Sequence, residues 1–144
     1  LYGNFGQSNY GAAKLALVGF MNCLKLEGEK YNIRVNCLSP SAATRMTSDI
    51  MSEETLARLA PEFVAPGVVA LAADDAPNGA ILCAGAGSFE RAFITLTQGE
   101  VIKDGDIAAQ VIGRFDGISN REGERLLVHG PQQAEFELTS AAAA

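Results

Sequence analysis

A long predicted helix with apolar residues on more than one side most strongly constrains how this 144-residue chain can fold. The helix is predicted over residues 8–30. Its apolar residues do not share a single stripe, and they are Leu15, Leu17, Val18, Met21 and Leu24. A helix of this kind must be covered on both sides. A predicted buried parallel strand over residues 33–38 follows it, and the alternation of helices and strands indicates an α/β fold.

Tyr10 and Lys14 lie four residues apart near the start of this helix and are separated only by small residues at positions 11–13. Side chains at this spacing lie on the same face of a helix. An ammonium beside a phenol favours the phenolate, so such a pair can donate or accept a proton near neutral pH. Taken alone, the spacing is also typical of a solvated helix face, and both interpretations stay open at this point.

The residues around this pair extend the pattern. The segment over residues 32–40 reads Asn-Ile-Arg-Val-Asn-Cys-Leu-Ser-Pro, a turn that leads into a strand ending at a proline. With a Tyr-x-x-x-Lys helix before it, the sequence resembles the short-chain dehydrogenase/reductase family. Residues 2–10, 44–47, 61–66 and 85–87 resemble, more narrowly, the (3R)-hydroxyacyl-CoA dehydrogenase units of multifunctional β-oxidation enzymes. The resemblance covers residues 1–98 and fades afterwards.

The resemblance implies a fold and an activity. The fold is the C-terminal half of a doubly wound, Rossmann-type parallel sheet over residues 1–88, followed by a C-terminal extension over residues 89–144. The activity is NAD(P)-dependent interconversion of hydroxyl and oxo groups, with hydroxyacyl and oxoacyl CoA thioesters as the implied substrates. In the family, the long helix also pairs with its counterpart in a second subunit.

The resemblance also implies roles for individual residues. Tyr10 donates the proton to the substrate carbonyl oxygen, and Lys14 assists it and hydrogen-bonds the nicotinamide ribose. Thr44 contacts the nicotinamide carboxamide. The loop that carries Thr44 is one residue shorter than the family pattern, and Ser41 replaces the usual glycine, so capping of the loop is the alternative for Thr44. Arg45 either meets a phosphate or is a solvated loop residue.

A glycine-rich turn for the dinucleotide pyrophosphate is absent from the 144 residues, since no Gly-x-x-x-Gly-x-Gly follows a predicted strand. We therefore expect the chain to be a fragment of an oxidoreductase that is inactive by itself and binds no cofactor tightly. The residue that selects NAD or NADP also falls outside it. The alternative is a non-catalytic oligomerisation module derived from such an enzyme.

The composition excludes several other function classes. A formal net charge of −6 and scattered basic residues argue against a nucleic-acid partner, and no apolar run suggests a membrane span. The three cysteines, of which Cys23 and Cys37 fall in predicted buried elements, and the single His129 predict neither disulfides nor a metal site. We expect a small-molecule substrate and a homodimer or higher homo-oligomer. We also expect a cytoplasmic location, with a peroxisomal or other organellar origin left open.

Local signals predict the remaining elements. Ser52 caps a short helix that Pro61 ends, and Pro66 lies in the first turn of the next helix. Residues 79–83 form a final strand, parallel to the first, and residues 85–87 form a turn at the sheet edge. Beyond them, strands are predicted around residues 89–96, 125–128 and 136–138, and a helix over 106–115.

Overall fold

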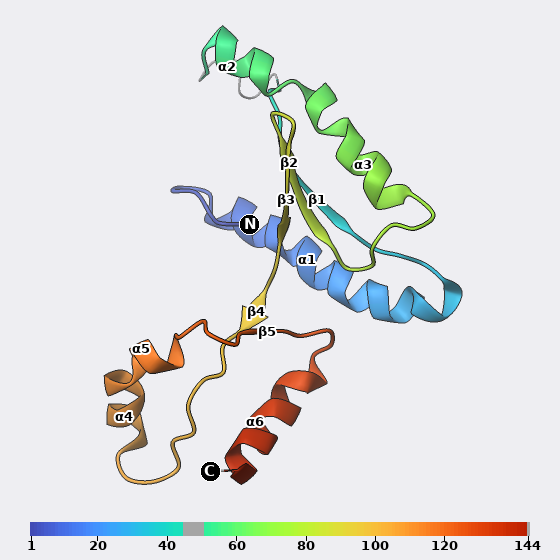
Figure 1. Cartoon of the computed structure of the whole chain (residues 1–144). Coiled ribbons are helices and arrows are strands. Elements are labelled where there is room, and N and C mark those ends of the chain that lie inside the picture. The colour runs from blue at the N-terminus through green and yellow to red at the C-terminus, as the bar shows by residue number, and fades with distance from the viewer. Residues whose placement is uncertain (45–50, 144) are drawn as a thin grey trace. The chain divides into compact units, whose positions relative to one another are not determined.

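The computed structural model of the protein describes residues 1–44 and 51–143 (Figure 1). The chain divides into two compact units, Leu1–Ala92 and Phe93–Ala144. The first unit holds the strands β1 (Cys37–Ser41), β2 (Ile81–Gly85) and β3 (Ser88–Ala92) and the helices α1 (Ser8–Gly28), α2 (Glu53–Arg58) and α3 (Ala65–Ala72). Helices on both sides of a partly parallel sheet confirm the predicted α/β fold.

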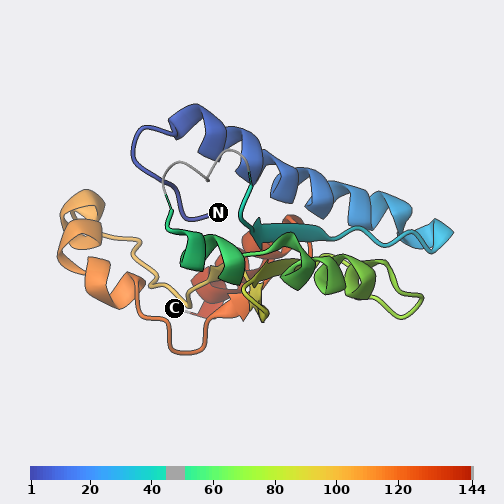
Figure 2. The ribbon, with the colours of Figure 1, turned by 90° about the horizontal axis from the view of Figure 1, so that it is seen from above.

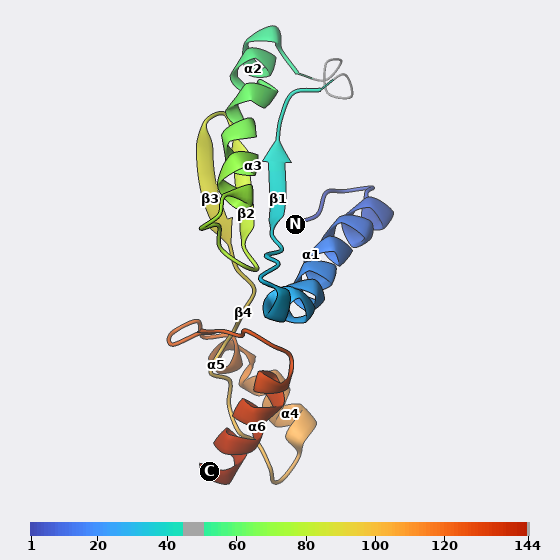
Figure 3. The same ribbon diagram turned by 90° about the vertical axis from the view of Figure 1, so that its right-hand side faces the viewer.

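The sheet of the first unit has the order β1-β2-β3. β1 and β2 run parallel with Cys37 opposite Ile81 and Ser41 opposite Gly85, as the sequence predicts for these two strands. β3 is antiparallel to β2 and was not expected in the sheet, because its residues fell in the predicted C-terminal extension. α1 lies on one face of the sheet and α3 on the other (Figures 2 and 3).

The first strand begins later than predicted. The sequence placed it over residues 33–38, whereas β1 spans Cys37–Ser41. Residues 35 and 36, just before β1, bond instead to the segment that leads into β2. The Val35 N–H donates to Asn78 Oδ1 at 2.9 Å, and the Asn36 side chain bonds to backbone groups of the segment that leads into β2. The apolar pattern therefore placed the strand too early, and the predicted segment is not buried: Ile33 is 53% exposed and residues 35–38 are half-buried.

α1 packs on the sheet through one side only. Val18 and Met21 are buried and form a cluster with Ile81 of β2, and Val35 and Cys37 pack against it. Other apolar side chains of α1 stay open to solvent, with exposed fractions of 46% for Leu15, 52% for Leu17 and 61% for Phe20. The sheet covers only the side of Val18 and Met21, so the coverage of the other side, which the sequence analysis assigns to a second subunit, stays a prediction.

Cys23 is exposed rather than buried, which corrects the sequence expectation. It follows the buried Met21 by two residues, a rotation of about 200° around a helix, and so points away from the sheet. Cys37 and Cys83 are half-buried in β1 and β2. All three are free thiols.

Caps and prolines set the helices between β1 and β2. Ser52 caps α2, its hydroxyl accepting a bond from the Thr55 N–H at 3.3 Å, and Pro66 lies in the first turn of α3, so both predictions are confirmed. Gly67 lets α3 approach the sheet, since a Cβ there would lie 3.2 Å from Leu82 and 3.3 Å from Leu38. Residues Glu53–Ala72 are long and apolar enough to cross a membrane by composition alone. They hold α2, a 3₁₀ turn (Pro61–Phe63) and α3 as separate pieces.

A two-residue turn joins β2 to β3. Gly85 pairs with Ser88, so Ala86 and Gly87 form the loop, and both have positive φ angles, 51° and 79°. Two residues with positive φ are what a type I′ hairpin turn requires. The predicted turn over residues 85–87 is thus a hairpin. Ala86 holds a left-handed conformation that alanine disfavours.

The second unit contains the antiparallel pair β4 (Thr95–Leu96) and β5 (Arg125–Leu126) together with the helices α4 (Ile107–Gly113), α5 (Phe115–Ile118) and α6 (Pro131–Ala143). Asp106 caps α4 by accepting a bond from the Ala109 N–H at 3.0 Å. The predicted strand over residues 136–138 is wrong. These residues lie within α6, where Pro131 supplies a helix start and the alanines favour its continuation.

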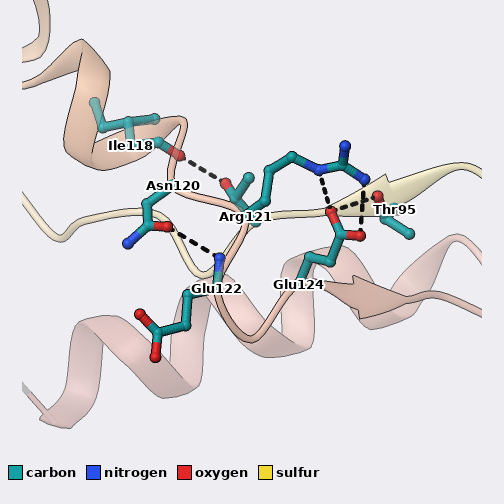
Figure 4. Close-up of polar contacts among 7 residues, drawn as sticks. Thr95, Ile118, Asn120, Arg121, Glu122 and Glu124 are labelled. Atoms are coloured by element: carbon teal, nitrogen blue, oxygen red, sulfur yellow. Dashed lines mark hydrogen bonds and ion pairs between the residues drawn. The ribbon is translucent and has the colours of Figure 1, made fainter.

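A polar cluster holds the connection between α5 and β5 (Figure 4). Arg121 donates two bonds to the Glu124 carboxylate, at 2.8 and 2.9 Å, and Thr95 of β4 donates a third at 3.1 Å. The bond from Arg121 lowers the pKa of the Glu124 carboxyl from its ordinary value. Thr97 donates to the Ile118 carbonyl at 2.7 Å. The Arg125 guanidinium lies 4.5 Å from the Phe136 ring centroid and ties α6 to β5.

The hairpin gives a direct test of the sheet geometry. Replacing Ala86 by glycine relieves the left-handed strain and should raise the free energy of unfolding by about 0.5–1 kcal/mol. Gly85→Ala is the matched control in the other direction, because its Cβ would lie 2.8 Å from the Ser41 backbone oxygen. That clash should cost about 1–3 kcal/mol. Urea unfolding measures both, and an unchanged or lower stability of Ala86→Gly would contradict the assigned turn.

Candidate functional site

Tyr10 and Lys14 lie in the first turns of α1, on one helix face, as their spacing predicts. The Lys14 ammonium nitrogen is 5.5 Å from the centroid of the Tyr10 ring. The Tyr10 side chain is 57% exposed, and its backbone N–H donates to Asn9 Oδ1 at 2.8 Å. Asn9 therefore acts at the start of the helix, and the pair stands open to a ligand.

A groove of about 480 Å³ runs between α1 and β1. Tyr10 and Lys14 line it from the start of α1, and Ser39 and Pro40 line it from β1. Its floor includes Val18, Met21 and Ile81, and its apolar wall includes Leu17 and Phe20. The structure thus places a phenol and an ammonium beside an apolar trough of the size that small ligands occupy.

Thr44 lies beyond the end of β1, where it is exposed, and it does not belong to the residues that line this groove. The structure brings Tyr10 and Lys14 together but does not bring Thr44 to them. The loop over residues 41–51 is described only in part, and Arg45, the candidate phosphate ligand, falls outside the described residues.

Asn36 is a groove residue to which the sequence analysis gave no role. Its side-chain nitrogen donates to the Pro77 carbonyl at 2.7 Å and to the Leu71 carbonyl at 3.3 Å, and its oxygen accepts from the Ala80 N–H at 2.9 Å. The signal was present in the Ile-Arg-Val-Asn segment, where an amide interrupts an apolar run. A half-buried side-chain amide needs hydrogen-bond partners, so an asparagine at this place indicates a structural role in a hydrogen-bond network.

Cys37 also lines the groove, and burial raises the pKa of its thiol. Its sulfur lies 3.7 Å from the Leu17 carbonyl oxygen, to which it donates. A thiol held protonated in this way is a poor nucleophile at neutral pH. No cluster of three or more His, Cys, Asp or Glu side chains that could hold a metal occurs in the described residues.

The arrangement suits proton transfer to an oxygen atom of a ligand in the groove. The Tyr10 hydroxyl is the proton-bearing group, and the Lys14 ammonium can stabilise negative charge on it or hydrogen-bond a ligand hydroxyl. In the described residues, no positive-φ glycine stands between a parallel strand and a following helix, so the site shows no cradle for a pyrophosphate.

Comparison with known proteins relates part of this chain to short-chain dehydrogenases. The profile of the short chain dehydrogenase family matches residues 1–55, which include Tyr10, Lys14 and β1. A putative short-chain type dehydrogenase/reductase of Mycobacterium tuberculosis is 45% identical over 127 residues, 88% of this chain and 44% of that protein. The peroxisomal multifunctional enzyme type 2 of Mus musculus is 40% identical over 104 residues, 72% of this chain and 14% of that protein.

Solved structures agree with this relationship. The full-length peroxisomal multifunctional enzyme type 2 of Drosophila melanogaster superposes with a TM-score of 0.79 and a sequence identity of 26%. The superposition covers 96% of this chain and 26% of that protein chain. A short chain dehydrogenase from Mycobacterium avium superposes with a TM-score of 0.64 and a sequence identity of 30%. The superposition covers 83% of this chain and 42% of that protein chain. The chain spans less than half the length of these proteins. Over the segment that it shares with them, the chain is therefore related to the short-chain dehydrogenase/reductase family.

Proposed function

We propose that this chain supplies the proton-transfer residues of an NAD(P)-dependent short-chain oxidoreductase. One observation carries the proposal: Tyr10 and Lys14 share a helix face and both line the groove between α1 and β1. The position of this pair within the residues that match the short chain dehydrogenase profile supports it. The whole activity needs a dinucleotide site, for which the described residues offer no pyrophosphate cradle.

Each residue has a separate part in the proposed reaction. When bound, the nicotinamide supplies or accepts the hydride. The Tyr10 hydroxyl gives its proton to the carbonyl oxygen of the substrate, or takes one from a hydroxyl in the reverse direction. Lys14 supports the phenolate and hydrogen-bonds the ribose, and Thr44 contacts the carboxamide. The apolar wall of Leu17 and Phe20 keeps water from one side of the groove.

The proposed substrates are hydroxyacyl and oxoacyl thioesters, such as CoA esters. Two observations support this class. The relatives include a peroxisomal hydratase-dehydrogenase-epimerase of Neurospora crassa, 51% identical over 78 residues, and several peroxisomal multifunctional enzymes. The likeness to the Drosophila enzyme covers 96% of the chain, so it reaches into the second unit rather than the Tyr–Lys helix alone.

The test joins this chain to an upstream dinucleotide-binding half. The 144 residues alone should not reduce acetoacetyl-CoA with NADH or NADPH, since they contain no Gly-x-x-x-Gly-x-Gly turn. In the joined protein, Tyr10→Phe should lower the reduction rate by about 10²–10⁴-fold, because it removes the proton donor. Cofactor affinity should stay close to that of the unsubstituted protein, because phenylalanine keeps the ring.

Lys14→Ala is the comparison variant, and it should weaken both the rate and the affinity for the cofactor, because its contacts include the ribose. Initial rates and cofactor titration by fluorescence separate the two effects. Wild-type turnover in the joined Tyr10→Phe protein, or reduction of acetoacetyl-CoA by the 144-residue chain alone, would contradict the proposed roles.

A second candidate function is a non-catalytic oligomerisation module. The exposed apolar residues of α1 favour it: Tyr10 and Phe20 are 57% and 61% exposed, and Leu15 and Leu17 are about half exposed. Apolar surface of this extent on one helix is typical of a surface that another protein covers. It is compatible with the enzymatic role if the catalytic protein is itself a homodimer or larger.

We expect the purified chain to form a homodimer or a higher homo-oligomer at low micromolar concentration. Burial of apolar surface stabilises such an assembly by about 25 cal/mol per Å². Sedimentation equilibrium measures the mass. Phe20→Glu, which places a charge on the exposed part of α1, should shift the distribution toward monomer, whereas Phe115→Glu in the second unit serves as the control. A folded monomer at these concentrations would rule out the module.

A further inference from the structure

Ser39 contributes a hydroxyl to the groove from the sheet side. It lies in the middle of β1, is half-buried, and lines the same groove as Tyr10 and Lys14. Among the residues that the structure describes, the Ser39 hydroxyl makes no hydrogen bond to another part of the chain. A hydroxyl in such a place bonds either to water or to a ligand, and it can donate one proton to an oxygen atom. Ser39 is therefore a candidate contact for a molecule in the groove.

The contact between β1 and α1 shows which turn of the helix Ser39 faces. The Cys37 sulfur donates to the Leu17 carbonyl at 3.7 Å, and Ser39 shares the face of Cys37 because it lies two residues further along the strand. Two strand residues rise about 6.6 Å, which equals about four residues of helix. α1 and β1 run in opposite directions (Figure 3). Ser39 therefore comes level with the turn of α1 that holds Tyr10 and Lys14.

The backbone around Ser39 holds its side chain in this position. A residue that precedes a proline is restricted to extended conformations, and Pro40 follows Ser39 directly. On its other side, Ser39 pairs in register with Cys83 of β2. A serine side chain also has only one rotatable bond that moves its oxygen, with three staggered positions. Such a donor loses little conformational freedom when it binds a ligand, which favours a role in recognition.

The other polar side chains of the groove already have partners or roles. Both N–H groups of the Asn36 side chain donate to backbone carbonyls, and the Cys37 thiol donates to a carbonyl of α1. Tyr10 and Lys14 have the roles proposed above. Of the polar side chains that line the groove in the described part of the chain, Ser39 is left to contact a further oxygen atom of the substrate.

We propose that Ser39 donates a hydrogen bond to the thioester carbonyl of a 3-oxoacyl thioester while Tyr10 serves the 3-oxo group. The inference rests on the function proposed above, because it adds a second contact to the same substrate. The two carbonyl groups of such a thioester are separated by a single methylene, so they need two donors a short distance apart. A hydroxyl of β1 that is level with a phenol of α1 supplies this pair. A donor dedicated to the second carbonyl disfavours ketones that lack it.

Two ketone substrates that differ by one carbonyl group test this role in the protein joined to a dinucleotide-binding half. Acetoacetyl-CoA has both carbonyl groups, whereas 3-oxobutyl-CoA keeps the ketone and the CoA but has a methylene in place of the thioester carbonyl. Ser39→Ala should lower kcat/KM for acetoacetyl-CoA about five- to tenfold, the effect of one hydrogen bond, and change that for 3-oxobutyl-CoA by less than about twofold. Ser39→Thr keeps a hydroxyl and should retain the preference for acetoacetyl-CoA.

The outcomes separate this inference from the proposed function. A selective loss with acetoacetyl-CoA in Ser39→Ala, with Tyr10→Phe impaired on both substrates, is the expected result. If Tyr10→Phe is impaired on both but Ser39→Ala loses the same factor on both, loses cofactor affinity or is unchanged, the role of Ser39 is overturned and the proposed function stands. Wild-type turnover of both substrates in Tyr10→Phe would contradict the proposed function, and the role of Ser39 with it.

Discussion

The bonds of the Asn36 side chain position the rest of the first unit. A single amide links three backbone sites: the Leu71 carbonyl in α3, the Pro77 carbonyl in the following loop and the Ala80 N–H just before β2. The adjacent Val35 N–H bonds to Asn78 in the same loop. These contacts set where β1 begins and which residue of β2 it meets. The register of the two strands then determines which side chains of the sheet meet α1.

The candidate site depends on this placement because its two sides come from different elements. α1 contributes Tyr10 and Lys14, whose mutual position follows from helix geometry alone. β1 contributes Ser39 and Pro40, which line the groove from the sheet side. The buried contact among Val18, Met21 and Ile81 joins the elements. Few side chains are buried here, so the amide bonds have a large share in fixing the geometry.

The sequence predicted those features of the fold that depend on local rules. The Tyr10–Lys14 pair, the Ser52 cap and the parallel pairing of β1 with β2 followed from spacing, capping and alternation. It did not predict what depends on distant contacts. The predicted start of β1 was too early because the Asn36 side chain bonds to a loop more than 35 residues further along the chain. The strand β3 was missed in the sheet because it depends on a turn in which Ala86 adopts an unusual φ.

Asn36→Asp, an almost isosteric change, tests whether the Asn36 amide holds β1 in register with β2. A carboxylate can still accept from the Ala80 N–H, but it would face the Leu71 and Pro77 carbonyls without a proton to donate. Denaturant unfolding of the full chain at pH 7 should show a loss of about 2–4 kcal/mol, the combined effect of two lost bonds and unfavourable contacts. Part of that loss, relative to the unsubstituted chain, should be recovered at acidic pH, where the protonated group can donate one bond. Equal stability of the two proteins at pH 7, or a loss that does not depend on pH, would contradict the account.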